Sequence, residues 1–270
     1  MSIADFEIYR YRLPLKKPLR LSNQTIFDRQ GLIIRLEDKN RHVGWGEIAP
    51  FPGLHNENLS AAEAQTVFLQ KKMAGFTLPE NLEAFPGVFE ERLGKFALRP
   101  SVRCGLETAL LNLMADRRHQ PLCSLLSAFP RKTVSLNGLV AENSANLSGQ
   151  IQALVEEGYR AIKLKVGRQS LEEDIALVKT ARELSPSSVT IRLDANRAWD
   201  LPRAVAFGKA LADCQIEYIE EPLQELPDLE KFYDQSGLPL ALDESLTHIS
   251  PHFFPTISVC DDPRRLWPRP

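Results

Sequence analysis

The hydrophobic and polar positions of the chain follow two successive patterns, and the change comes at about residue 98. Before it, apolar residues alternate with polar ones over residues 5–13, 31–37 and 42–49, which predicts half-buried strands. Residues 38–41 have the composition of a tight turn, so the last two strands are expected to pair as an antiparallel hairpin. Helical patterns follow these strands. Residues 1–98 are therefore predicted to form an α+β domain.

Two local signals add detail to this first domain. Ser60 and Glu63 have the spacing of a capping box, which predicts a helix that begins at Ser60 and ends near residue 74. Residues 19–30 are polar and rich in turn-forming residues, which favours a mobile loop between the first two strands.

After residue 98, short apolar runs alternate with helical patterns. Ser101 is predicted to cap a helix, and the first strand of this part is predicted at residues 133–138. Ser170 and Glu173 form a second capping box, at the start of a later helix. Regular alternation of strand and helix predicts a parallel sheet, in either a doubly wound fold or a (β/α) barrel.

The most informative segment is the apolar run between Gly158 and Gly167, because it contains Lys163 and Lys165. Side chains two residues apart on a strand leave on the same face, so the two ammonium groups are expected to lie side by side. Two like charges on a buried strand are unfavourable unless carboxylates, a metal site or a substrate lie opposite them.

Three later apolar runs end in a carboxylate. These are Asp194, Glu220 and Asp243, at steps of 26 and 23 residues, about the length of one strand–helix unit. Functional groups at the C-terminal ends of strands favour the barrel over the doubly wound sheet, since barrel enzymes collect them on that face. Three carboxylates at adjacent strand ends could converge on a divalent cation, and oxygen ligands alone suit Mg²⁺.

Each of these motifs by itself has a simpler interpretation. A Lys-x-Lys pair is commonly the solvated face of an edge strand, and Asp194-Ala-Asn196 is commonly a turn at a strand end. Glu220-Glu-Pro222 could simply end a strand, and Asp243-Glu-Ser245 could cap a helix. Their occurrence in order, one strand–helix unit apart, favours a shared site over four separate coincidences.

Composition narrows the classes of function. The 270 residues are 43% hydrophobic and 25% charged, as in ordinary globular proteins. A net charge of −2 gives no electrostatic basis for binding nucleic acid or an anionic membrane. The four cysteines include no C-x-x-C pair, which argues against a zinc site or a disulfide framework. No apolar run approaches the length of a membrane span and the N-terminus lacks a signal-peptide pattern, so a cytoplasmic location is expected.

Several longer motifs occur in an order that can be compared with known families. They are Gly44-Trp-Gly-Glu-Ile-Ala-Pro-Phe-Pro-Gly53, Pro100-Ser-Val-Arg-Cys-Gly105, Lys163-Leu-Lys-Val-Gly167, Leu193-Asp-Ala-Asn-Arg-Ala-Trp199, Ile219-Glu-Glu-Pro222 and Asp243-Glu-Ser245. By these motifs the chain resembles the enolase superfamily, from residue 5 to about residue 255. Within the superfamily it looks most like the o-succinylbenzoate synthases, in its first and fourth motifs.

This resemblance implies a fold and a metal site. The fold would be a (β/α) barrel of the TIM type with an N-terminal α+β capping domain, as in enolase. Asp194, Glu220 and Asp243 would hold Mg²⁺ or Mn²⁺, with Glu220 rather than Glu221 as the second ligand.

The resemblance also implies roles for the remaining candidate residues. Lys165 would be the catalytic base, and Lys163 would keep it oriented. Arg192, which shares a strand face with Asp194, and Asn196 are expected to contact a small-molecule carboxylate substrate.

The activity implied is that of a carbon–oxygen lyase. The synthases dehydrate 2-succinyl-6-hydroxy-2,4-cyclohexadiene-1-carboxylate to o-succinylbenzoate in menaquinone biosynthesis. Dipeptide epimerases, N-acylamino acid racemases and muconate cycloisomerases use the same metal triad, so these activities stay open. A catalytically inactive remnant is a further alternative.

The chain departs from the family after its fifth predicted barrel strand. The barrel is confined to residues 99–258, whereas a complete one takes about 250 residues. The family's second catalytic lysine lies on the sixth strand, and no lysine follows Lys231 here. Residues 259–270 are expected to be an irregular tail, which favours a truncated or frameshifted product. With barrel strands missing, Ile162 and Leu164 are expected to lose packing partners, and low stability and activity should follow.

Overall fold

The computed structural model describes residues 2–20, 24–51, 57–77, 79, 81–140 and 146–248. The chain forms two compact units, Met1–Lys132 and Thr133–Pro270, and each has a hydrophobic core of its own. The division falls at Lys132 rather than at the predicted residue 98, because the next helix packs on the first unit's sheet. The predicted tail, residues 259–270, lies outside the described residues.

The first unit is built on a three-stranded antiparallel sheet in the order β1-β2-β3. The strands are β1 (Ile3–Arg20), β2 (Thr25–Asp38) and β3 (Val43–Ile48). The hairpin between β2 and β3 is confirmed. The mobile loop predicted at residues 19–30 is wrong over most of its length, because β1 and β2 continue to pair as far as Arg20 and Thr25. Polar side chains there also pair across the strands, as in the ion pair of Arg12 with Asp28.

The helices α1 (Leu59–Lys72) and α3 (Pro100–Arg117) pack on this sheet. The unit also contains α2 (Phe85–Leu93), the 3-10 turn η1 (Gly94–Phe96) and α4 (Leu122–Leu126), which contacts α3. The predicted capping box of α1 is wrong. The side chain of Asn58 accepts the N–H of Ala61, so the helix begins at Leu59, and Glu63 instead pairs with Arg10.

The start of α3 also differs from the prediction. The helix begins at Pro100, one residue before Ser101, and the residue before it makes no side-chain cap. The backbone N–H and the hydroxyl of Ser101 both donate to the carboxylate of Glu57, at 3.2 and 2.6 Å. A carboxylate from another segment therefore satisfies this helix terminus.

Glycines allow α3 to lie directly on β3. A Cβ on Gly46 would overlap the carbonyl oxygen of Gly105, and a Cβ on Gly44 would overlap that of Ala109. A Cβ on Gly105 would likewise meet the backbone of Glu47. Two of the motifs that carry the family resemblance are therefore needed for close packing of helix against strand.

The second unit contains a five-stranded parallel sheet. Its strands are β4 (Gly138–Leu139), β5 (Ala161–Lys165), β6 (Thr190–Asp194), β7 (Ile216–Glu220) and β8 (Leu240–Ala241). They are arranged in sequence order, β4-β5-β6-β7-β8. A doubly wound sheet would reverse its order at a switch point, so the arrangement is that of part of a (β/α) barrel. The first strand is shorter than predicted, because residues 133–137 form no ladder.

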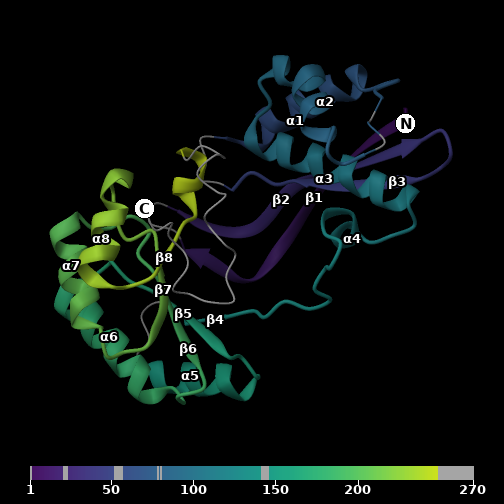
Figure 1. The fold of residues 1–270 in the computed structure, drawn as a ribbon. Coiled ribbons are helices and arrows are strands. Elements are labelled where there is room, and N and C mark those ends of the chain that lie inside the picture. Colours follow the sequence, from purple (N-terminus) through teal and green to yellow (C-terminus); the bar gives the residue numbers. More distant parts are fainter. Residues whose placement is uncertain are drawn as a thin grey trace. The chain divides into compact units, whose positions relative to one another are not determined.

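Helices connect successive strands of this sheet. They are α5 (Leu147–Glu156), α6 (Leu171–Leu184), α7 (Leu201–Ala210), η2 (Leu226–Asp228) and α8 (Leu229–Ser236). The 3-10 turn η3 (Glu244–His248) follows β8. The predicted capping box of Ser170 and Glu173 is confirmed at the start of α6. In Figure 1, α6, α7 and α8 follow one another along the same side of the strands.

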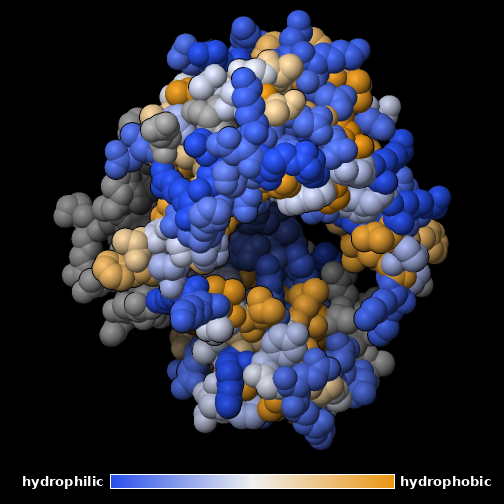
Figure 2. All heavy atoms as spheres, turned by 90° about the vertical axis from the view of Figure 1, so that its right-hand side faces the viewer, coloured by the Kyte–Doolittle hydropathy of each residue, from blue (hydrophilic) through white to orange (hydrophobic). Residues whose placement is uncertain are grey.

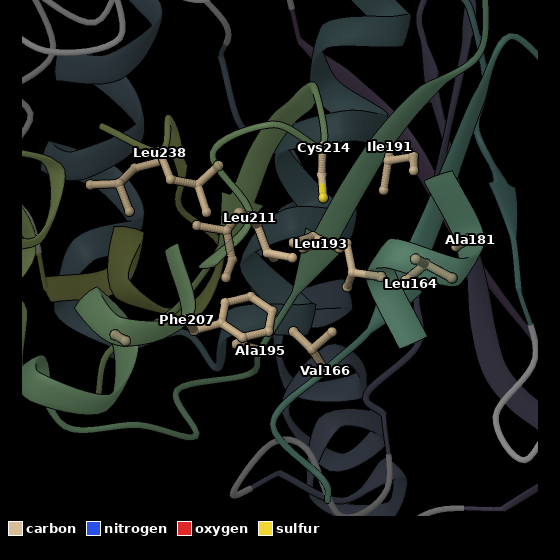
Figure 3. Close-up of a cluster of buried hydrophobic side chains, with 14 of the residues drawn as sticks. Leu164, Val166, Ala181, Ile191, Leu193, Ala195, Phe207, Leu211, Cys214 and Leu238 are labelled. Atoms are coloured by element: carbon tan, nitrogen blue, oxygen red, sulfur yellow. The ribbon is translucent and has the colours of Figure 1, made fainter. Parts of the chain in front are cut away.

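The core of the second unit lies between the sheet and these helices. Figure 3 shows Leu164 from β5 and Leu193 from β6 packed near Phe207 of α7. Ile162 and Leu164, which were expected to lose packing partners, are in fact buried. They alternate with the two lysines along β5 and so face the helices, whose packing does not require further strands.

Polar residues cover most of the face shown in Figure 2, with hydrophobic residues in smaller groups between them. Some large apolar side chains are nonetheless exposed, among them Phe27, Phe129 and Val134. In the described part of the chain, no helix has both the length and the apolar character needed to cross a membrane.

Substitution of Gly46 by alanine should destabilise the first unit by about 1–3 kcal/mol, because the new methyl group meets backbone atoms that cannot rotate away. Gly87→Ala is the matched control. Gly87 lies in α2 with open space around its Cβ position, so its substitution should be neutral or slightly stabilising. Urea denaturation of both variants measures the difference. Equal midpoints for the two would show that α3 and β3 do not need this close approach.

Candidate active site

Two lysines and an aspartate meet at the C-terminal ends of β5 and β6. Lys165 is in register with Asp194, and its Nζ donates to Asp194 Oδ2 at 2.6 Å. Lys163 Nζ lies 2.9 Å from the same oxygen. The shared face predicted from the two-residue spacing of the lysines is therefore confirmed.

Glu220 extends this cluster to the next strand. It is in register with Asp194 and accepts a hydrogen bond from Lys163 Nζ at 2.6 Å. One ammonium group thus lies between carboxylates from two neighbouring strands. The sequence predicted this meeting of Asp194 and Glu220, because the C-terminal ends of parallel strands share one edge.

The charges in this cluster control one another. Burial raises the pKa of Asp194, but Lys165 and Lys163 lower it more strongly, so the net pKa falls. Burial lowers the pKa of Lys163, and its bonds to Glu220 and Asp194 reverse the shift, so the net pKa rises. Asp194 and Lys163 therefore stay ionised at neutral pH, although Asp194 is only 1% exposed.

Glu220 is shifted in the opposite direction from Asp194. Burial raises its pKa, and the bond from Lys163 only partly offsets this, because the negative charges of Asp194 and Asp243 raise it further. Both partners of the Lys163–Glu220 bond thus have raised pKa values. The causes differ, because bonds to carboxylates raise the pKa of Lys163, whereas burial is the main cause for Glu220 and the charges of Asp194 and Asp243 add to it.

Asn196 connects the cluster to the loop that follows β6. Its backbone has a left-handed φ of 44°, and its N–H donates to Asp194 Oδ1 at 3.1 Å. Its side-chain oxygen accepts from Lys165 Nζ at 2.7 Å, and its Nδ2 lies 3.4 Å from Glu244 Oε1. Asn196 therefore orients Lys165, and its contact with a substrate stays a prediction.

Arg192 lies two residues before Asp194 on β6, and its side chain leaves the strand on the same face. Its guanidinium forms two hydrogen bonds with Glu217, at 2.8 and 3.2 Å, and a third with Asn137 at 3.1 Å. It also lies over the ring of Tyr218, 5.3 Å from the centroid. The sequence reasoning missed these partners. Only Tyr218 had a signal, since its spacing from Glu220 places both on one face of a strand.

Asp243 is the predicted metal ligand that the structure does not bring into direct contact with Asp194 and Glu220. It is exposed at the start of η3, although its charge reaches Glu220. Its backbone N–H is held by the buried carboxylate of Glu221, at 2.7 Å. Across the described ranges, no three His, Cys, Asp or Glu side chains are placed to hold a metal ion.

Comparison with known families identifies the chain. A model described as the enolase C-terminal domain-like family matches residues 146–255, and a model of the MenC N-terminal domain matches residues 3–113. The chain belongs to the enolase superfamily. Solved structures of superfamily members match the fold of this chain. The parallel sheet of the second unit therefore corresponds to part of their barrel.

Two curated relatives show how far the similarity extends. The chain is 35% identical to the protein PHYLLO, chloroplastic, of Arabidopsis thaliana, over 90% of this chain but only 15% of that protein. It is 31% identical to the o-succinylbenzoate synthase of Pectobacterium atrosepticum, over 88% of this chain and 66% of that enzyme. This superfamily member therefore spans a small part of the first relative and about two thirds of the second.

Two solved structures from the superfamily are informative. The L-Ala-D/L-Glu epimerase of Bacillus subtilis, in a substrate-liganded complex, matches with a TM-score of 0.80 at 26% identity, over 91% of this chain and 68% of that one. The o-succinylbenzoate synthase of Thermosynechococcus elongatus BP-1, complexed with Mg in its active site, matches with a TM-score of 0.63 at 29% identity. That match covers 89% of this chain and 69% of the other.

The residues of this superfamily member suit a hard divalent cation in their chemistry. Lys163 Nζ already places positive charge within 3 Å of both Asp194 and Glu220, at 2.9 and 2.6 Å. Carboxylate oxygens are the ligands that Mg²⁺ prefers. Burial and the negative charges of Asp194 and Asp243 raise the pKa of Glu220, so a further positive charge beside it would be favourable. To complete such a site, the side chain of Asp243 would have to turn toward the other two.

The bidentate pair of Arg192 and Glu217 should contribute about 1–2 kcal/mol of coupling energy in a double-mutant cycle with Arg192→Met and Glu217→Leu, since both side chains are largely buried. The pair of Lys231 and Asp228 is more exposed and should give less than about 0.5 kcal/mol. The measurement is the free energy of unfolding at pH 7. Coupling no greater than that of the control pair would contradict the expectation.

The same pair predicts a dependence on pH. Burial raises the pKa of Glu217, but Arg192 lowers it more strongly, so the folded-state pKa lies below the unfolded one. The stabilisation is therefore present at neutral pH and is lost as the pH falls through the folded-state pKa.

Proposed function

We propose that this protein acts as an o-succinylbenzoate synthase, a lyase that removes water from 2-succinyl-6-hydroxy-2,4-cyclohexadiene-1-carboxylate. The observation that carries the proposal is the convergence of Lys163, Lys165, Asp194 and Glu220 at three adjacent strand ends. The match of residues 3–113 to the MenC N-terminal domain supports the synthase over other members of the superfamily. So does the 31% identity to a curated synthase.

In this proposal Lys165 is the catalytic base. Its Nζ would take the proton from the carbon that carries the ring carboxylate, and would return a proton to the departing hydroxyl group, which leaves as water. The product ring is aromatic, which favours the elimination. Lys163 would add positive potential, and Asn196 would hold Lys165 in the direction seen in its 2.7 Å hydrogen bond.

Asp194, Glu220 and Asp243 would hold Mg²⁺ or Mn²⁺. A bound divalent cation would stabilise the negative charge that develops on the substrate carboxylate as the proton leaves. In the arrangement described here Lys165 Nζ donates to Asp194 Oδ2, so Asp194 would need another positive partner before this Nζ could turn to a substrate.

Replacement of Asp194 by asparagine should weaken Mn²⁺ binding on the order of 100-fold, because one of three charged ligands is lost. Asp38→Asn is the control, since Asp38 is an equally buried carboxylate in the first unit that is bonded to His42 and not to this cluster. Calorimetric titration of the three proteins with Mn²⁺ tests the expectation. Equal affinities for the wild type and Asp194→Asn would remove Asp194 from the metal site.

A dipeptide epimerase is the second candidate function. The observation in its favour is structural, since the TM-score is 0.80 for the Bacillus epimerase and 0.63 for the Thermosynechococcus synthase. Epimerisation needs the same removal of a proton next to a carboxylate, but the proton returns to the opposite face of the carbon. The two reactions therefore differ in the substrate and in the second proton transfer.

Assays of both reactions in parallel decide between the two candidates. With Mg²⁺ present, the wild type should convert the cyclohexadiene carboxylate to an aromatic product and leave L-Ala-D-Glu unchanged. Lys165→Ala should lower the rate by about 10²–10⁴-fold, the usual contribution of a general base. The exposed Lys231 is the control position, and Lys231→Ala should keep full activity. Faster α-proton exchange into the dipeptide, measured by NMR in D₂O, would favour the epimerase instead.

A further inference from the structure

Glu221 follows Glu220 directly, but its side chain points away from the lysines. It is completely buried in the described structure. Lys163, the lysine partner of Glu220, bonds instead to Glu220 and Asp194. Its hydrogen bonds go to the segment that follows β8, where the third predicted ligand lies.

Three donors from this segment converge on the carboxylate of Glu221. Its Oε1 accepts the backbone N–H of Asp243 at 2.7 Å and that of Ser245 at 2.9 Å. Its Oε2 accepts the hydroxyl of Ser245 at 2.6 Å. The two oxygens of a carboxylate have enough acceptor capacity for all three bonds. These bonds fix the backbone at the first turn of η3.

The backbone of Glu221 is tied to both neighbouring strand ends. Its N–H donates to the carbonyl oxygen of Ala241 on β8 at 3.1 Å, and its carbonyl oxygen accepts the N–H of Arg197, after β6, at 2.7 Å. Its φ is +45°, in the left-handed region that a glutamate rarely adopts. Such a conformation persists when surrounding contacts determine it, and strained residues of this kind cluster at functional sites.

We propose that Glu221 is a positioning residue that holds Asp243 in place to act as a metal ligand beside Glu220. The inference rests on the proposed metal site. It adds a role for Glu221 that differs from the role of Glu220. Glu220 faces the charged cluster, and Glu221 fixes the turn that presents Asp243 to the same cluster.

The geometry makes a specific demand on the side chain at this position. A glutamine could still accept both backbone N–H groups through its oxygen, and its amide could donate to Ser245 after the hydroxyl group rotates. An alanine would leave the N–H groups of Asp243 and Ser245 without this acceptor in a buried turn. Glu221→Gln should therefore preserve the position of Asp243, and Glu221→Ala should not.

Titration of the full chain with Mn²⁺, followed by electron paramagnetic resonance of the free ion, tests the proposal without any assay of activity. Glu221→Ala should bind Mn²⁺ about 10–100-fold more weakly than the wild type, as is usual when a partner of a ligand is removed. Glu221→Gln should stay within about threefold, because its two backbone acceptor bonds remain.

Glu57→Ala is the matched control. Glu57 is also buried and accepts a backbone N–H and a hydroxyl group from one serine, Ser101, but it lies in the first unit. Its substitution should lower the melting temperature and leave Mn²⁺ affinity unchanged. If Glu57→Ala and Glu221→Ala weaken Mn²⁺ binding equally, the effect is general destabilisation and the proposal is overturned.

The remaining outcomes separate this inference from the proposed function. A wild type that does not bind Mn²⁺ overturns both. A wild type that binds, with Glu221→Ala binding equally well, overturns only the role of Glu221. If Glu221→Ala does not fold, Ser245→Ala takes its place, because it removes only the hydroxyl donor. That variant should then bind Mn²⁺ several-fold more weakly, and wild-type affinity in it would overturn the proposal.

Discussion

The buried carboxylate of Asp194 is the group on which the candidate active site depends. A carboxylate that is 1% exposed is unstable unless positive charge lies against it, and here Lys163 and Lys165 both do. Because the lysines come from β5 and the carboxylate from β6, the charge balance requires the observed register of these strands. A shift of one residue would turn the lysines toward the helices. The charge balance of the site and the pairing of β5 with β6 therefore depend on each other.

The turn after β7 extends this constraint to the next strand. Glu220 and Glu221 are adjacent in sequence, yet one faces the lysines and the other is buried against the turn that contains Asp243. The left-handed backbone at Glu221 lets the chain bond to both neighbouring strand ends at this point. A charged cluster of this kind needs these backbone bonds, since carboxylates that repel one another separate unless the backbone holds them in place.

In the first unit, glycines allow α3 to pack directly against β3. Gly44 and Gly46 on β3 face Gly105 and its neighbours on α3, where no Cβ would fit. The motifs around these residues hold a helix on a strand. The motif around Lys165 instead places charged groups against one another.

The sequence by itself determined the features that depend on local spacing. These are the paired lysines on one face, the carboxylates at strand ends and the capping box of Ser170, each of which follows from the period of a strand or a helix. Only the tertiary structure decided the features that depend on distant residues. The strand ends at residues 19–20 and 25–30 exist because they pair with each other, and Arg192 is bound by Glu217 from the next strand. The first unit extends beyond residue 98 to Lys132 for the same reason, since the helix after residue 98 packs on a sheet formed earlier in the chain. Local periodicity carries no information about which distant surface will bury a segment, and burial decided each of these cases.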